Sequence, residues 1–267
     1  MLRSEGLFAR RAGDGGPALL LLHGLGATGT VWDGLCARLA DAWPGSWLVP
    51  DLPGHGRSAP LPHYSIGGLA AEVAHLVEPE EPVVAFGHSL GGAVALALGS
   101  GWFGARPSAV GGLGIKIRWT PEELARAGEM AARPPRIFPT REEAADRALK
   151  VAGLAGLVPP DGPLADGAIV PAESGWRLAL DPAAFAVGAP DMDGMLSVCR
   201  AARVPVALAA GEHDPMSPLE HLQPLVPDPL LLKGLGHNAH VEDPTALLPI
   251  LERLAAAATA RSARSAG

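Results

Sequence analysis

The stretch VVAFGHSLGG, residues 83–92, decides the fold. It contains the pattern Gly-x-Ser-x-Gly, which is typical of a sharp turn that leads from a strand into a helix and lifts a serine hydroxyl clear of the sheet. Gly87 and Gly91 flank Ser89 because a side chain at either position would collide with the crowded turn. A strand-like apolar run precedes the turn, and a helix-like run, AVALAL, follows it. We therefore predict that Ser89 is a nucleophile; the competing interpretation is that it only caps a helix.

Short apolar runs like the one before Ser89 recur along the chain, and each ends in a glycine or a turn. They lie at residues 18–24, 47–54, 83–89, 204–214 and 229–237. Because these runs are apolar throughout instead of alternating, they are typical of strands that are covered on both faces, as in a parallel sheet. Helix-like stretches at residues 64–77 and 90–99 lie between them. The pattern predicts an α/β fold in which a mainly parallel central sheet carries helices on both faces.

The alternation stops between Lys116 and about Pro190, where no strand-like run is found. Thr120 and Thr140 are each followed three residues later by a glutamate, which is the capping-box pattern that starts a helix. Asp181, which is followed by proline, predicts a third helix start. These signals predict a helical insertion into the sheet.

The insertion divides the sequence of the core into two parts. We expect residues 1–115 and 191–267 to form the core and residues 116–190 to form a helical cap. An amphipathic helix at about residues 245–259 is expected to close the core. The low-complexity tail, residues 260–267, is expected to fray.

Composition limits the classes of partner. The chain has 267 residues, is 48% hydrophobic and carries a net charge of −7, so it can build a large core and shows no basic patch for nucleic acid or anionic lipid. Cys36 and Cys199 lie far apart without a CxxC spacing, so neither a disulfide framework nor a zinc site is expected. The N-terminal region lacks the apolar segment of a secretion signal, and its longest apolar run, residues 18–22, is too short to span a bilayer. We expect a cytoplasmic protein that acts on a small neutral or hydrophobic molecule without a metal or an organic cofactor.

A serine hydroxyl needs help to act as a nucleophile at neutral pH. A base must take its proton, and a carboxylate must hold that base in the right tautomer. His237 stands where an apolar run ends and a loop begins, and Asp214 stands just past the end of the preceding predicted strand. The chain order Ser89, Asp214, His237 is the order that a nucleophile turn of this type requires. We predict these three residues as nucleophile, acid and base.

The reaction also needs hydrogen-bond donors for the oxyanion that forms when the serine attacks a carbonyl group. One predicted donor is the backbone N–H of Leu90, at the N-terminus of the helix after Ser89, where the helix dipole favours negative charge. The other is the N–H of Leu25, in the glycine-rich turn HGLGAT at residues 23–28.

Five motifs resemble those of the α/β-hydrolase superfamily, in the order and spacing of that family. They are HGLG at 23–26, DLPGHGRS at 51–58, GHSLGG at 87–92, GEHDPMSP at 211–218 and GLGHNAHVEDP at 234–244. The resemblance covers nearly the whole chain. It implies the α/β-hydrolase fold, Ser89 as nucleophile, Asp214 as acid, His237 as base and a helical cap at the inserted segment.

His240 is the rival of His237 as the base. The resemblance favours His237, because the family places a glutamate five residues after its catalytic histidine and Glu242 fits that spacing. The two histidines could instead bind a metal together with His213, but no third ligand stands at a recognisable spacing.

Other histidines and aspartates offer further alternatives. We expect structural roles for the loop histidines His23, His55 and His88, with His88 held beneath the turn. Asp51 is interpreted as a turn-forming residue. Asp191 and Asp193 are alternative acids, although both precede the next core strand.

The inserted segment is expected to roof Ser89 and to decide which substrate is accepted. Trp119, Phe138 and Trp176 are the candidates for lining a substrate pocket. Lys116 or Arg118 is a candidate for meeting a substrate carboxylate or polar head group; the competing interpretation is a solvated basic residue at the hinge of the cap.

The sequence therefore predicts a serine hydrolase that cleaves a small-molecule carboxylic ester through an acyl-enzyme intermediate. A carbon–carbon bond hydrolase, a thioesterase or a lactonase would use the same residues. The resemblance argues against dehalogenase and epoxide-hydrolase chemistry, which needs an aspartate at position 89. The alternative from another class is a small-molecule receptor or signalling protein with little turnover. The oligomeric state does not follow from the sequence.

Overall fold

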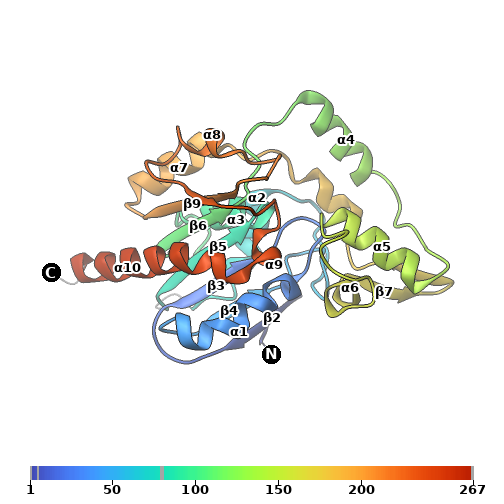
Figure 1. Cartoon of the computed structure of the whole chain (residues 1–267), viewed down its shortest axis with the longest axis horizontal. Coiled ribbons are helices and arrows are strands. Elements are labelled where there is room, and N and C mark those ends of the chain that lie inside the picture. Colours follow the sequence, from blue (N-terminus) through green and yellow to red (C-terminus); the bar gives the residue numbers. More distant parts are fainter. Residues whose placement is uncertain (1, 5, 79–80, 266–267) are drawn as a thin grey trace.

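A mainly parallel sheet forms the centre of the protein in the computed structural model, which describes residues 2–4, 6–78 and 81–265. The eight strands follow the order β1-β2-β4-β3-β5-β6-β9-β10 (Figure 1). They are β1 (Leu2–Ser4), β2 (Leu7–Ala12), β3 (Ala18–Leu22), β4 (Trp47–Pro50), β5 (Val83–His88), β6 (Ala109–Leu113), β9 (Val206–Gly211) and β10 (Leu230–Leu232). Neighbours from β4 to β10 pair in parallel, which confirms the predicted fold class.

The five apolar runs of the sequence contain β3, β4, β5, β9 and β10. Strands β3, β5 and β6 are buried along their whole length, as expected for strands that are covered on both faces. The carboxyl ends of β3, β5, β6, β9 and β10 meet at one edge of the sheet, so the loops that follow them come together there.

The antiparallel strands β1 and β2 were missed by the sequence reasoning. Strand β2 pairs antiparallel with β4 and alternates between buried positions, such as Leu7 and Ala9, and partly buried ones, such as Phe8 and Arg10. Its sequence, LFARRA, therefore contains no continuous apolar run. A strand with one more solvent-exposed face gives a weaker sequence signal than a strand that is covered on both faces.

Helices cover both faces of the sheet. Helices α2 (Ile66–Ala74), α3 (Leu90–Leu98) and α7 (Met192–Ala201) contribute to one apolar core, and α1 (Asp33–Ala42) and α10 (Leu248–Ser265) contribute to the other. Short helices complete the core: η1 (Gly29–Trp32), α8 (Leu219–Leu222), α9 (Ala239–Glu242) and η3 (Pro244–Leu247). This arrangement is the predicted α/β sandwich.

The inserted segment, residues 116–190, lies to one side of the sheet (Figure 1). It contains α4 (Pro121–Ala131), α5 (Arg141–Val151), α6 (Pro163–Gly167), β7 (Ile169–Ala172), β8 (Gly175–Leu178) and η2 (Pro182–Val187). The predicted helix starts are observed: Thr120 forms a reciprocal capping box with Glu123, and the Thr140 side chain accepts a hydrogen bond from the N–H of Glu143. Asp181 caps η2, a 3₁₀ helix, by accepting from the N–H of Ala183.

The expectation that this segment holds no strand is wrong, because β7 and β8 form an antiparallel hairpin. Of the residues in the two strands only Ile169 is buried, so the apolar pattern that marks a core strand is missing. The strand sequence IVPA also contains a proline and an alanine, and GWRL contains a glycine and an arginine. None of these residue types indicates a strand.

The end of the chain is more helical than expected. Helix α10 continues to Ser265 through most of the tail that was expected to fray. Residues 266–267 lie outside the described part of the chain.

Within the described ranges, we find no helix whose length and hydropathy would let it traverse a lipid bilayer.

Candidate active site

Ser89 stands at the apex of a strained turn between β5 and α3. Its φ is 51°, a left-handed conformation that, among the described non-glycine residues, only Arg203 shares. Such a conformation costs on the order of 1–3 kcal/mol and persists only where the surroundings enforce it. A Cβ on Gly87 would collide with the backbone of Gly91, and a Cβ on Gly91 would collide with the carbonyl group of Leu22. The two flanking glycines therefore permit the turn, as predicted from the sequence.

Asp214 and His237 meet beyond the ends of β9 and β10. The Nδ1 of His237 lies 2.9 Å from the Oδ2 of Asp214. The carboxylate side chain is fully buried, and its Oδ1 also accepts hydrogen bonds from the backbone N–H groups of Met216, at 2.8 Å, and Ser217, at 3.2 Å. Because a carboxylate accepts, the Nδ1 of His237 carries a proton in this pair, and the Nε2 of the neutral ring is left with a lone pair.

Gly114 allows this pair to sit against the end of β6. Its φ is +62°, and a Cβ at this position would lie 3.1 Å from the Oδ2 of Asp214 and 3.2 Å from the Nδ1 of His237. Any side chain here would have a strained backbone conformation and would lie too close to both the carboxylate and the imidazole.

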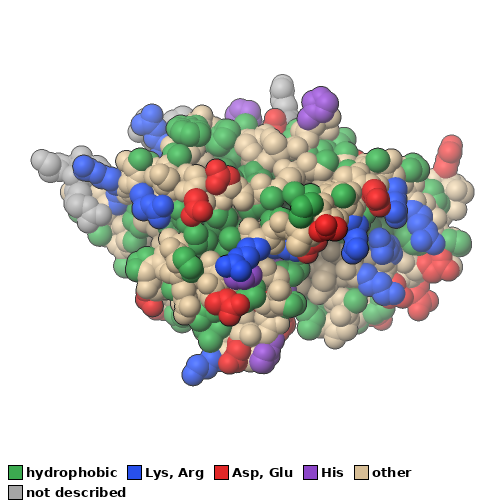
Figure 2. Space-filling view, turned by 90° about the horizontal axis from the view of Figure 1, so that it is seen from above, with side chains coloured by type: hydrophobic (Ala, Val, Ile, Leu, Met, Phe, Trp, Pro, Cys, Tyr) green, Lys and Arg blue, Asp and Glu red, His purple; other side chains and the backbone are tan. Residues whose placement is uncertain are grey.

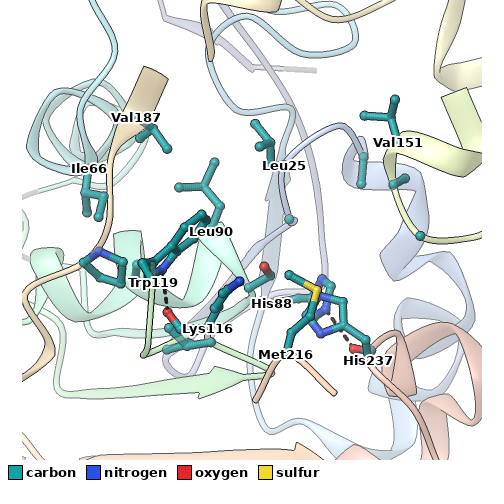
Figure 3. Close-up of a pocket in the computed structure, with 18 of the residues that line it drawn as sticks. Leu25, Ile66, His88, Leu90, Lys116, Trp119, Val151, Val187, Met216 and His237 are labelled. Atoms are coloured by element: carbon teal, nitrogen blue, oxygen red, sulfur yellow. Dashed lines mark hydrogen bonds between the residues drawn. The ribbon is translucent and has the colours of Figure 1, made fainter. Parts of the chain in front are cut away.

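One cavity of about 310 Å³ brings Ser89 and His237 together. Leu25 and Leu90, whose N–H groups were predicted as oxyanion donors, also line it (Figure 3). The loop that holds Leu25 passes directly against the nucleophile turn, since a Cβ on Gly24 would lie 3.4 Å from the Cβ of Ser89. Leu90 is the first residue of α3, where backbone N–H groups are free of intrahelical partners. The cavity thus brings together four of the residues predicted from the sequence, and Asp214 contacts His237 beside it.

His88 is buried beneath the turn, as expected. Its Nε2 lies 2.9 Å from the carbonyl oxygen of His237, and its ring centroid lies 4.6 Å from that of His237. Burial holds the pKa of His88 well below its ordinary value, so the ring is neutral near pH 7 and donates to this carbonyl. His88 therefore supports the backbone of His237.

His23 and His55 hold the loops on the other side of the cavity. The Nε2 of His23 accepts a hydrogen bond from the N–H of Leu52 at 2.8 Å, and burial lowers the pKa of His23 to about 4. The Nδ1 of His55 lies 3.0 Å from the carbonyl oxygen of Pro53, and burial lowers the pKa of His55 to about 3. These contacts support the structural roles expected from the sequence.

His240, the rival base, is buried and does not line the cavity that contains Ser89. Its ring packs against Trp32 at 4.7 Å and His88 at 4.3 Å between centroids, and burial lowers its pKa to about 3. Glu242, whose spacing favoured His237, accepts a hydrogen bond from the N–H of Gly236 at 2.8 Å and so orders the loop that carries His237.

The alternative acids serve as turn and cap residues. Asp51 accepts hydrogen bonds from the N–H groups of Gly29, at 2.7 Å, and Arg57, at 2.9 Å. Asp191 caps α7 by accepting from the N–H of Gly194 at 3.0 Å. Across the described residues, His, Cys, Asp and Glu side chains form no group of three or more that could hold a metal ion.

Lys116 and Trp119 line the cavity (Figure 3). The ammonium group of Lys116 forms an ion pair with Glu123 and lies 4.7 Å from the centroid of the Trp119 ring. The indole Nε1 of Trp119 donates to the carbonyl oxygen of Lys116 at 3.1 Å. The charge of Lys116 is therefore already paired.

Phe138 and Trp176 do not line this cavity, contrary to expectation. Each donates its backbone N–H to the other's carbonyl oxygen, at 2.7 and 2.9 Å, so Phe138 extends the edge of the β7–β8 hairpin away from Ser89. Arg118 is exposed and also lies outside the cavity lining.

The sequence reasoning missed many of the lining residues, among them Ile66, Val151, Val187 and Met216. Met216 stands in the motif GEHDPMSP, two residues after Asp214, so its position in the chain was an available signal. Ile66, Val151 and Val187 come from α2, α5 and η2, and their meeting depends on how the inserted segment packs.

The chain belongs to the alpha/beta hydrolase family, whose model matches residues 19–250. It is 42% identical over 91 residues to the uncharacterized protein Rv2715 of Mycobacterium tuberculosis, a match that covers 33% of this chain and 26% of the relative. It is 37% identical over 110 residues to the lipase LipV of the same organism, covering 40% of each chain. The chain thus matches between about a quarter and two fifths of the length of these relatives.

The fold is also that of the M. tuberculosis esterase Rv0045c. The two structures superpose with a TM-score of 0.72 at 22% identity, over 94% of this chain and 89% of the other. At this level of identity, the similarity supports the fold alone. The family model and the fold therefore agree on an alpha/beta hydrolase.

Proposed function

We propose that the protein is a serine hydrolase that cleaves a small-molecule carboxylic ester through an acyl-enzyme intermediate, with residues 116–190 acting as a cap over the site. The observation that carries the proposal is the hydrogen bond of 2.9 Å between Asp214 and His237, made at the same cavity as the strained Ser89. A buried carboxylate, an imidazole and a serine hydroxyl at a sharp turn are the groups that acyl transfer requires.

In the proposed first step, the Nε2 of His237 takes the proton of the Ser89 hydroxyl while the Oγ forms a bond to the ester carbonyl carbon. The π electrons of the carbonyl group move to its oxygen, which accepts hydrogen bonds from the N–H groups of Leu25 and Leu90. The carbon–oxygen bond to the leaving alcohol then breaks, and the alcohol takes the proton from His237. Asp214 orients the ring and stabilises its positive charge throughout.

In the second step, a water molecule resolves the acyl-enzyme. His237 takes a proton from the water as the water oxygen attacks the acyl carbon, and the same two N–H groups donate hydrogen bonds to the new oxyanion. The bond between the acyl carbon and the Oγ of Ser89 breaks, the serine recovers its proton and the carboxylic acid leaves. Each oxyanion donor is expected to contribute about 10²-fold or more to the rate, because the donors are fixed before the charge develops.

The choice of an ester is supported by the character of the relatives, which include a lipase and an esterase. The same side chains would also serve a thioester, a lactone or a carbon–carbon bond, so substrate panels should include these classes. A receptor with little turnover would keep the cavity and lose catalysis.

The test compares Ser89→Ala with Ser174→Ala, a matched change at an exposed turn residue between β7 and β8. We expect wild type and Ser174→Ala to react with a fluorophosphonate and to hydrolyse p-nitrophenyl acetate or butyrate. Ser89→Ala should do neither. Hydrolysis that survives in Ser89→Ala would overturn the mechanism, and labelling of Ser89 without turnover of any ester, thioester or lactone would favour the receptor.

A further inference from the structure

A second cavity, of about 170 Å³, lies within the inserted segment next to the first. Its walls are mostly apolar and come from α4, α5, the loop between these two helices and the chain from β8 into η2. The apolar lining residues are Met130, Pro134, Pro135, Phe138, Val151, Leu178, Leu180, Pro182 and Phe185, and three arginines, Arg133, Arg136 and Arg147, complete the lining.

Val151 is the wall that the two cavities share. It is the last residue of α5 and packs on the loop that holds Leu25, since a Cβ on Gly26 would lie 2.5 Å from the Cγ1 of Val151. Arg147 stands four residues earlier on α5 and therefore on the same face of the helix. A chain that runs from Ser89 past Val151 would enter the second cavity beside this arginine.

The three arginines of the second cavity lack acidic partners. In the described part of the chain, none of the ion pairs involves Arg133, Arg136 or Arg147, whereas Arg141 on the same helix as Arg147 is paired with Asp166. Figure 2 shows blue side chains gathered over the end of the molecule that carries the inserted segment, with red ones around them. Glu143 and Asp146 line an adjoining hollow with Arg136 and Arg147, but neither carboxylate is in one of the ion pairs of the described residues, so these arginines are available to a ligand.

All three arginines are exposed, and one of them, Arg136, is held against an aromatic ring. The guanidinium carbon of Arg136 lies 4.7 Å from the centroid of the Phe138 ring. Pro134 and Pro135 separate Arg133 from Arg136, and two consecutive prolines restrict the backbone of this loop. Less conformational freedom is lost when such residues bind a ligand.

We propose that the second cavity binds a carboxylate at the far end of a linear ester substrate whose scissile bond lies at Ser89. The apolar walls take the methylene chain, and the guanidinium groups form paired hydrogen bonds with the carboxylate. This inference rests on the proposed function and names its substrate class. It replaces Lys116 as the partner of a substrate carboxylate, because Lys116 is paired with Glu123.

The test uses two series of methyl esters of equal chain length. One series consists of monomethyl esters of linear dicarboxylic acids, and the other of methyl esters of the corresponding monocarboxylic acids. In wild type, we expect kcat/KM to favour the carboxylate-bearing ester by about tenfold, the worth of one charge-assisted hydrogen-bonded pair. The preference should be present only in chains long enough to pass Val151, whereas general attraction to a basic surface would act at every length.

The double variant Arg136→Gln/Arg147→Gln should lose this preference, so that kcat/KM for the carboxylate-bearing esters falls about tenfold relative to kcat/KM for neutral esters of the same length. Arg126→Gln is the matched control, because Arg126 is exposed on α4 and lines neither cavity. Equal rates of wild type on both series at every length, or an equal effect of the double variant on both series, would overturn the inference. If neutral esters still require Ser89 in that case, the proposed function stands; if Ser89→Ala hydrolyses them, the proposed function itself fails.

Discussion

Helices α3 and α4 show how differently the core and the inserted segment are built. Helix α3, which follows Ser89, is buried in eight of its nine residues, whereas none of the described residues of α4 is buried. The turn at Ser89 therefore lies between two buried elements, β5 and α3, whereas α4 lies at the surface. In the proposed function, the catalytic groups therefore lie on the densely packed core, and part of the substrate cavity is formed by the less buried inserted segment.

The largest expected effect concerns the acid in the core. Asp214→Asn should lower kcat by on the order of 10³–10⁴-fold, because an amide no longer favours the tautomer of His237 with its proton on Nδ1. Steady-state kinetics on a p-nitrophenyl ester measure this. Asp166→Asn in the inserted segment, which removes the partner of Arg141 at the surface, should leave kcat unchanged. A loss of less than tenfold in Asp214→Asn would argue against its role.

Two glycines test the difference in packing directly. Gly91→Ala should destabilise the fold by about 3 kcal/mol, because the new methyl group would collide with the carbonyl group of Leu22. Gly128→Ala on α4 has no other described atom within 4 Å of the new Cβ and should stabilise the protein by up to about 1 kcal/mol through helix propensity. Denaturant unfolding measures both changes. Similar effects of the two changes would refute the contrast between the regions.

The core is also expected to carry the pH dependence of stability, since residues 116–190 contain no histidine. Burial lowers the pKa of His23 to about 4 and of His55 and His240 to about 3, so each ring takes up a proton in the unfolded chain before it does in the folded one. Their contribution is complete above about pH 6.5 and is lost as the pH falls toward 4, by about 1 kcal/mol per pH unit for each ring.

Unfolding free energies of wild type and His240→Phe between pH 7 and pH 4 test this. The unfolding free energy of the variant should decline less steeply as the pH falls, and the slopes should differ by about the contribution of one proton. His63→Phe at an exposed position should follow wild type. An unchanged slope in His240→Phe would contradict the assignment of the neutral, buried ring.

The smallest expected effect lies at the start of α4. Thr120→Ala removes a reciprocal capping box and should cost about 1 kcal/mol. Because α4 packs loosely, hydrogen exchange should rise in α4 and remain unchanged in α3. A uniform rise in both helices would mean that the inserted segment is coupled to the core more tightly than its burial indicates.

The same contrast explains what the sequence predicted. Ser89, Asp214 and His237 follow β5, β9 and β10, and the parallel order of a sheet brings the residues after such strands to one edge. Local patterns were therefore enough to place them. Phe138 and Trp176 belong to a hairpin edge whose position depends on contacts between distant elements, so residue type alone could not show that both lie outside the lining of the cavity that contains Ser89.

The core strands of the fold were also predictable from local sequence patterns. Strands that are covered on both faces, such as β3 and β5, leave a continuous apolar run. Strand β2 and the β7–β8 hairpin do not, because water or polar groups reach one of their faces. Val151 was missed as a wall of both cavities because that role depends on packing between α5 and the loop near Gly26.

The central claim is that Ser89 is the nucleophile that His237 activates. The most direct measurement is peptide mapping by mass spectrometry after reaction of the wild type and His237→Ala with a fluorophosphonate. We expect one adduct, on Ser89, in the wild type, and at least about a hundredfold slower formation of it in His237→Ala, since the hydroxyl has lost its base. An adduct on another residue, or equal rates in the two proteins, would contradict the account.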